Sequence, residues 1–164
     1  MINEFWNLVL ETWQQGIRGI GIDNIIICLL IIMGSLVARA LMNTYLLDKI
    51  AKLTEKSETT LDDEIIESLR GPFGLIPVAF GLYLITAYLP FSGSLDLIAT
   101  NLVKMLVIYT IFSALANLTK PLLNLLSDNS WLTPAMTTWL SRVASVLVWI
   151  VGITMMLDIW GIEI

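Results

Sequence analysis

The sequence lacks histidine altogether and contains a single cysteine, Cys28. Histidine is the commonest metal ligand and the usual proton carrier near neutral pH, so its absence removes the most frequent metal and general-base chemistries. One cysteine cannot form a disulfide within the chain. Cys28 lies in a long apolar run, where we expect it to act as a small buried hydrophobe rather than as a reactive thiol.

Recognisable catalytic and phosphate-binding motifs are also missing. No serine lies in a Gly-x-Ser-x-Gly sequence, and no GxxxxGK[ST] phosphate loop is present. The acids Asp62, Asp63 and Glu67 lack the spaced oxygen ligands of a calcium-binding loop. We therefore expect no enzyme activity, no metal and no cofactor. The net charge of −5 gives no indication of nucleic acid as a partner.

Charged residues are scarce, and hydrophobic residues are abundant. Only 14% of the residues are charged, against about 25% in soluble domains. Hydrophobic residues make up 57%, and the mean hydropathy is +0.81. These values predict an all-α integral membrane protein. From the apolar runs we predict four transmembrane helices, near residues 24–45, 73–89, 97–118 and 143–157.

Residues 1–20 are too polar to cross a membrane. Their apolar residues recur at spacings of three and four, which is typical of one helix face, and they include Trp6 and Trp13. We predict an amphipathic helix that lies in the membrane interface. The first charged residue of the segment is the acid Glu4 rather than a basic residue, so the segment does not fit a cleavable signal peptide.

Residues 49–70 form the one long polar segment. Thr59 and Thr60 followed by three acids predict a helix start here, because acids complement the helix dipole. Proline removes a backbone donor and clashes with the preceding turn, so we expect a break at Gly71-Pro72 and a further kink at Pro77. The segment is predicted to be an elbow between two helices. Its candidate residues are Lys49, Lys52, Lys56, Arg70, Gly71 and Pro72.

The distribution of basic residues predicts the orientation. With the four spans above, one side of the membrane holds seven of them and the other side two, Arg18 and Lys104. Cytoplasmic loops carry the excess of Lys and Arg. We therefore expect a multi-pass protein of the bacterial inner membrane, with residues 49–70 in the cytoplasm and the N-terminus outside. The seven are Arg39, Lys49, Lys52, Lys56, Arg70, Lys120 and Arg142.

Small residues and tryptophans mark expected helix contacts and membrane boundaries. Small residues let helices approach closely in lipid, and tryptophans prefer the interface. Thr133-Pro134 predicts the start of the last helix. Lys104 either reaches the near interface or pairs with an acid or a lipid phosphate. The packing candidates are Gly34, Ala38, Gly74, Gly81 and Gly152. The boundary candidates are Trp131, Trp139, Arg142 and Trp160.

A weak repeat suggests how the spans are organised. At a spacing of 71 residues, Leu69, Gly81 and Pro90 correspond to Leu140, Gly152 and Gly161. This pattern predicts the interfacial helix of residues 1–20, a first helical hairpin at 21–90 and a second at 91–164.

Several of these segments resemble the small-conductance mechanosensitive channel (MscS-like) family. The resemblance rests on the helix start at Thr60–Glu64 with IIESLRGPFGLIPVAFGLYL after it, on the unit from Trp131 onward, and on the ending Leu157–Ile164. It covers roughly residues 30–164. It implies a homo-heptamer whose outer helices are tension-sensing paddles with lipids between them. Family members continue with a pore helix and a cytoplasmic vestibule, which the 164 residues do not contain.

The resemblance therefore implies the sensor part of a channel that relieves osmotic stress. No pore-lining residue can be carried over. One alternative is a stand-alone membrane scaffold or assembly subunit without a pore. A second is part of a secondary transporter, which is less favoured because the repeat is parallel and no acid lies deep in a predicted span.

Overall fold

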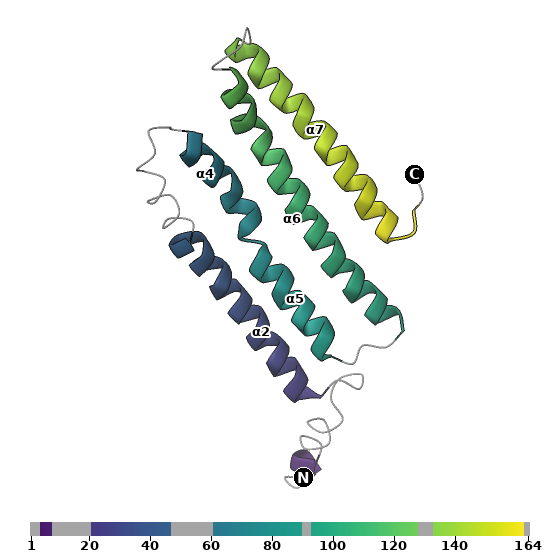
Figure 1. The fold of residues 1–164 in the computed structure, drawn as a ribbon. Coiled ribbons are helices and arrows are strands. Elements are labelled where there is room, and N and C mark those ends of the chain that lie inside the picture. The colour runs from purple at the N-terminus through teal and green to yellow at the C-terminus, as the bar shows by residue number, and fades with distance from the viewer. Residues whose placement is uncertain (1–3, 8–20, 47–60, 90–92, 128–132, 163–164) are drawn as a thin grey trace.

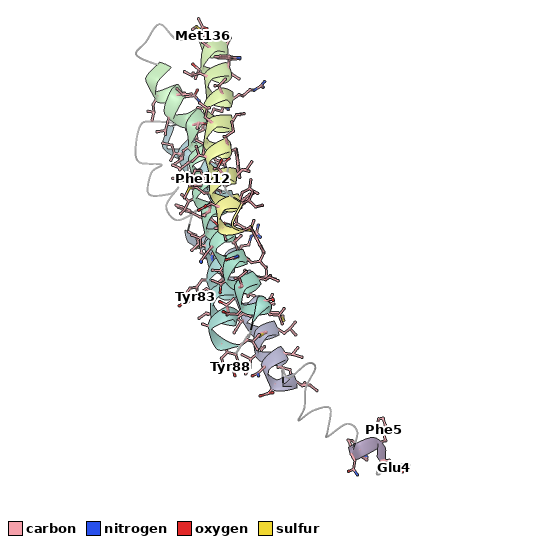
Figure 2. All side chains as sticks on the ribbon, turned by 90° about the vertical axis from the view of Figure 1, so that its right-hand side faces the viewer. Glu4, Phe5, Tyr83, Tyr88, Phe112 and Met136 are labelled. Carbon is pink, nitrogen blue, oxygen red and sulfur yellow. The ribbon has the colours of Figure 1, made fainter. Side chains whose placement is uncertain are left out.

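Four helical rods lie side by side in a single row, and the second rod consists of two consecutive helices, α4 and α5. The computed structural model describes residues 4–7, 21–46, 61–89, 93–127 and 133–162, and within these ranges it contains helices and no strand. Figure 1 shows the rods in chain order, and Figure 2, turned by 90°, shows that the row is one helix thick. The elements are α2 (Ile22–Leu41) with the π-helical turn η1 (Met42–Leu46), α4 (Leu61–Phe73), α5 (Ile76–Tyr88), α6 (Ser94–Ser127) and α7 (Pro134–Ile159).

All four rods are long and apolar enough to cross a membrane, as predicted. The spanning segments are Ile22–Tyr45, Glu64–Tyr88, Ser94–Leu125 and Pro134–Ile159. The helices are longer than the predicted spans because they continue beyond the apolar runs. With 34 residues, α6 is about 51 Å long, whereas the hydrocarbon core is ~30 Å thick. The protein is therefore a multi-pass, all-α membrane protein.

Several sequence-based predictions fall outside the described residues. Of the expected amphipathic helix, only a helical turn at residues 4–7 is described, where the rings of Phe5 and Trp6 pack edge to face. Other residues singled out from the sequence also lie in undescribed segments: Arg18, Lys49, Lys52, Lys56, Thr59, Thr60 and Trp131.

Each rod packs chiefly on its neighbours in the row. α2 packs on α5, both α4 and α5 pack on α6, and α6 packs on α7. No residue of α2 is buried, and the buried hydrophobic residues of the described part are few. Such a thin layer is stable in lipid, because lipid tails solvate apolar side chains as well as a protein core does. Since α5 contacts both α2 and α6, and α4 contacts both η1 and α6, the row does not by itself separate the two predicted hairpins.

Three glycines lie where helices approach closely. A Cβ at Gly81 would lie 2.6 Å from Ser35 Cβ, and one at Gly152 would lie 2.8 Å from Phe112 Cγ. Gly74 lies under the side chain of Asn43, 2.9 Å from its amide atoms by the same measure. By contrast, Gly34 has open space around it, and with Ala38 it lines a shallow groove between α2 and α5.

The break in the second rod occurs later than Gly71-Pro72, so that part of the prediction is wrong. α4 continues through both residues to Phe73, and α5 begins at Ile76. The break lies at Gly74-Leu75, two to three residues before the kink predicted at Pro77, which itself lies in the first turn of α5. Pro77 has no amide to donate to the carbonyl of Phe73, and its ring crowds that carbonyl. The chain makes a tighter turn instead, in which the amide of Leu75 donates to the carbonyl of Pro72 at 2.9 Å.

A polar seam joins α6 and α7. The hydroxyls of Thr119 and Ser145 are 2.7 Å apart, and Ser145 also lies 3.0 Å from the carbonyl of Ala116, to which it donates. Thr137 and Ser141, on the same side of α7, are buried. Hydroxyl and small side chains of this kind let membrane helices pack closely and hydrogen-bond to one another.

Both ends of α7 are capped. Thr133 accepts a hydrogen bond from the amide of Met136 and Pro134 is the first helical residue, which confirms the predicted start. At the other end Gly161 has a positive φ of 74°, and its amide donates to the carbonyl of Asp158 while that of Ile162 donates to Leu157. This is a Schellman cap, which favours glycine at the position with positive φ.

We predict that Gly152→Ala destabilises the contact between α6 and α7. The new methyl would meet the Cβ and ring of Phe112, and overpacking of this kind costs about 1 to 3 kcal/mol. Gly34→Ala is the matched control, because helical glycine-to-alanine changes are otherwise favourable and nothing lies near that site. Unfolding in bicelles should give a lower free energy of unfolding for Gly152→Ala than for the control. Equal values for the two variants would contradict the close contact.

The hydroxyl seam gives a second prediction. Thr119→Val and Ser145→Ala should each lower the free energy of unfolding by about 0.6 to 1.7 kcal/mol, and the double variant should lose less than the sum, because the two hydroxyls bond to each other. Thr154→Val is the control, since Thr154 donates only to Ile150 of its own helix. Additive losses in a double-mutant cycle would show that the two hydroxyls are not coupled.

Candidate functional site

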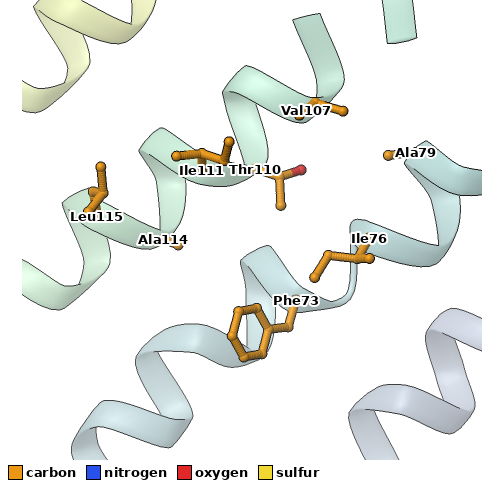
Figure 3. Close-up of a pocket in the computed structure, with 8 residues that line it drawn as sticks. All are labelled: Phe73, Ile76, Ala79, Val107, Thr110, Ile111, Ala114 and Leu115. Atoms are coloured by element: carbon orange, nitrogen blue, oxygen red, sulfur yellow. The ribbon is translucent and has the colours of Figure 1, made fainter. Parts of the chain in front are cut away.

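An apolar groove lies beside the break between α4 and α5. Its volume is about 380 Å³, and Figure 3 shows residues from both sides of the break facing residues of α6 across it. The only polar side chain in its wall, Thr110, donates to the carbonyl of Leu106 in its own helix. The groove therefore offers van der Waals contacts to hydrocarbon and no free polar group for catalysis. It is lined by Phe73, Ile76, Ala79, Val107, Thr110, Ile111, Ala114 and Leu115.

Polar contacts hold α4 against α6 on one side of this groove. Asn117 of α6 donates to the carbonyl of Ser68 at 3.2 Å. Further along α6, Asn124 donates to both carboxylate oxygens of Glu64, at 3.0 and 3.2 Å. The ammonium of Lys120 lies 3.5 Å from the same carboxylate. α4 is thus attached to α6 by three polar side chains as well as by apolar packing.

A second polar contact ties α4 to the end of α2. Arg70 donates from Nη1 to the backbone carbonyl of Asn43 in η1 at 2.9 Å, and from Nε to Glu67 at 2.9 Å. The side-chain oxygen of Asn43 is buried and has no hydrogen-bond partner among the described residues. Of the predicted elbow residues, Arg70 therefore bonds the neighbouring helix, Pro72 is fully buried, and Gly71 is exposed with open space around it.

The described boundary candidates lie in or next to α7, toward its two ends. Trp139 and Arg142 are exposed on the first half of α7, and Trp139 is 67% exposed. Trp160 follows α7 at the opposite end, where its indole N–H donates to the sulfur of Met105 at 2.8 Å. Lys104, the residue before Met105, is exposed and forms no ion pair with any residue that the structure describes.

The structure adds functional candidates that sequence reasoning missed. The groove itself, Asn117 and Asn124 were not identified, and neither was Asn101, which is buried and donates to the carbonyl of Ile159 at the end of α7. Asparagine within an apolar run was the available signal, because a polar amide in lipid needs a partner. The described residues contain no group of three or more metal-ligating side chains. Comparison of the chain with protein-family models, curated proteins and solved structures finds no match.

The contact around Glu64 makes a third prediction. Lys120→Gln should change the free energy of unfolding by ~0.5 kcal/mol or less, because the ion pair is long and largely exposed. Asn124→Leu should cost about 1 to 2 kcal/mol, because it removes the amide that bonds both carboxylate oxygens. Unfolding of the two variants in bicelles at one salt concentration measures the difference. A larger loss for Lys120→Gln would show that the ion pair dominates.

Proposed function

We propose that this region is the membrane-tension-sensing part of a mechanosensitive channel that relieves osmotic stress. The observation that carries the proposal is the broken rod beside a groove with an apolar wall, in a layer only one helix thick. Lipid can contact both faces of such a layer. Tension favours the state with the larger area in the membrane plane, so a joint that lets one helix tilt couples shape to tension.

The arrangement of charges supports the expected orientation. α2 and α6 end, and α4 and α7 begin, at the same end of the helix axes, which is the upper end in Figure 1. Among the described basic residues, Arg39 lies in the last turn of α2 and Lys120 lies in the C-terminal part of α6. Arg70 lies in the last turn of α4, where it bonds the carbonyl of Asn43 in η1, and Arg142 lies in the first half of α7. Under the proposal this end faces the cytoplasm, in a bacterial inner membrane, and the N-terminus lies outside.

Lipids and identical subunits are the partners that the proposal requires. The exposed apolar side chains on α2 and α7, the two edges of the row, would contact lipid or neighbouring copies. The resemblance to the MscS-like family implies seven copies arranged around a pore, and two hairpin units in each copy. In this arrangement Trp139, Arg142 and Trp160 fix the depth of α7, and Lys104 meets the interface or a lipid phosphate.

A stand-alone scaffold is the principal alternative, since exposed apolar faces also suit contact with other membrane proteins. Part of a secondary transporter is less favoured. Transport by proton relay uses charged side chains inside the bundle, and no charged side chain that the structure describes is buried. Pressure-activated currents distinguish the channel from the scaffold.

The fourth prediction tests the sensor role. Trp139→Ala and Arg142→Ala in the full-length protein should raise the pressure threshold measured by patch clamp, because α7 loses its anchors at one membrane boundary. Leu147→Ala is the control, since Leu147 is an exposed apolar residue further along the same helix. Unchanged thresholds in both anchor variants would contradict the sensor role, and the absence of any pressure-activated current would favour the scaffold.

A further inference from the structure

Pro72 creates a defect in α4 that α6 repairs. In an α-helix the amide of residue 72 would donate to the carbonyl of residue 68, but proline has no amide hydrogen. The carbonyl of Ser68 instead accepts a hydrogen bond from the side-chain amide of Asn117, at 3.2 Å. Pro72 itself is fully buried. A backbone bond within one helix has therefore been replaced by a bond between two helices.

The joint between α4 and α5 also lacks a backbone hydrogen bond because of a proline. Pro77 cannot donate to Phe73, so the regular hydrogen-bond ladder is interrupted between the two helices. At the joint the amide of Gly74 donates to the carbonyl of Arg70, and the amide of Leu75 donates to the carbonyl of Pro72. A short helix-terminal segment of this kind can absorb the backbone rotation of a hinge.

α4 carries charged residues and α5 does not, so α4 can also be stable at the membrane interface. α4 carries Glu64, Glu67 and Arg70 on an amphipathic helix, whereas α5 contains no charged residue. An unpaired carbonyl is costly in hydrocarbon but is readily satisfied by water. The carbonyl of Ser68 has a partner when α4 is docked, where it is bonded to Asn117, and would also have one, water, if α4 lay in the membrane interface.

We propose that Pro72 and Asn117 form a latch that holds α4 against α6, and that its release lets α4 pivot at Gly74-Leu75 toward the membrane interface. Phe73 and Ile76 flank the pivot and line the groove, so release also changes the groove. The contacts of Glu64 with Asn124 and of Arg70 with Asn43 add to the docked state. The inference concerns the conformation of this chain and does not depend on the proposed channel function.

Spin-label distances in liposomes test the latch. Cys28→Ala removes the only native cysteine, and Glu67→Cys on α4 with Leu140→Cys on α7 then reports the position of α4. A second pair, Phe80→Cys on α5 and Ile153→Cys on α7, reports the rest of the row. All four labelled positions are exposed. Pulsed electron resonance gives the distance distribution of each pair.

Asn117→Leu should raise the ratio of undocked to docked α4 about five-fold, the change expected for one interhelical hydrogen bond of ~1 kcal/mol. The reference pair should not change. On a Pro72→Ala background the same substitution should have no effect, because the restored amide can bond Ser68 within α4. An equal effect of Asn117→Leu in both backgrounds would reduce Asn117 to a packing residue and overturn the proposal. So would no effect in either background, or an equal shift at the reference pair.

Discussion

The need to satisfy backbone carbonyls in a lipid environment shapes most of this fold. An unbonded carbonyl in hydrocarbon costs several kcal/mol, and the helices leave such groups at their ends and beside prolines. Among the described residues, side-chain donors from neighbouring helices serve five carbonyls, those of Ser68, Ile159, Ala116, Ser141 and Asn43. The interhelical hydrogen bonds therefore fall where α-helices are interrupted, end or pack closely, and they fix the relative heights of the rods.

This constraint explains how a layer with so little core can have a defined structure. Burial contributes little, since lipid solvates the outer faces of α2 and α7 as well as protein would. Directional contacts take over the role of a core. Phe112 against Gly152 sets the register of α6 and α7, and Ser35 against Gly81 does the same for α2 and α5. Both contacts require a glycine in one of the two helices, because a Cβ there would meet the partner side chain. The absence of a side chain at Gly81 and Gly152 therefore determines how the helices pack.

The sequence predicted the spans well and the connections between them less well. Hydropathy locates the four helices because the requirement for an apolar surface is local to each run. The position of the break was wrong because two prolines compete within six residues. The carbonyl of Ser68, which Pro72 leaves without an amide donor in α4, accepts a hydrogen bond from Asn117, 45 residues after Pro72, and no local pattern encodes that partner. The small size of glycine predicted close packing at Gly81 and Gly152. Their partners Ser35 and Phe112 could not be predicted, because they depend on how the helices align with one another.

The two contacts made by α6 differ in kind, and this difference indicates where the row can change shape. Toward α7, α6 presents buried small and hydroxyl side chains, and Thr119 and Ser145 bond each other across a close contact. Toward α4, it presents longer amides that reach a carboxylate and a carbonyl, beside an open groove. A close contact resists separation over its whole length, because every small displacement loses many van der Waals contacts. Long polar side chains can exchange their partners for water at the interface. Any rearrangement of the row should therefore begin between α4 and α6, with α6 and α7 moving as one unit.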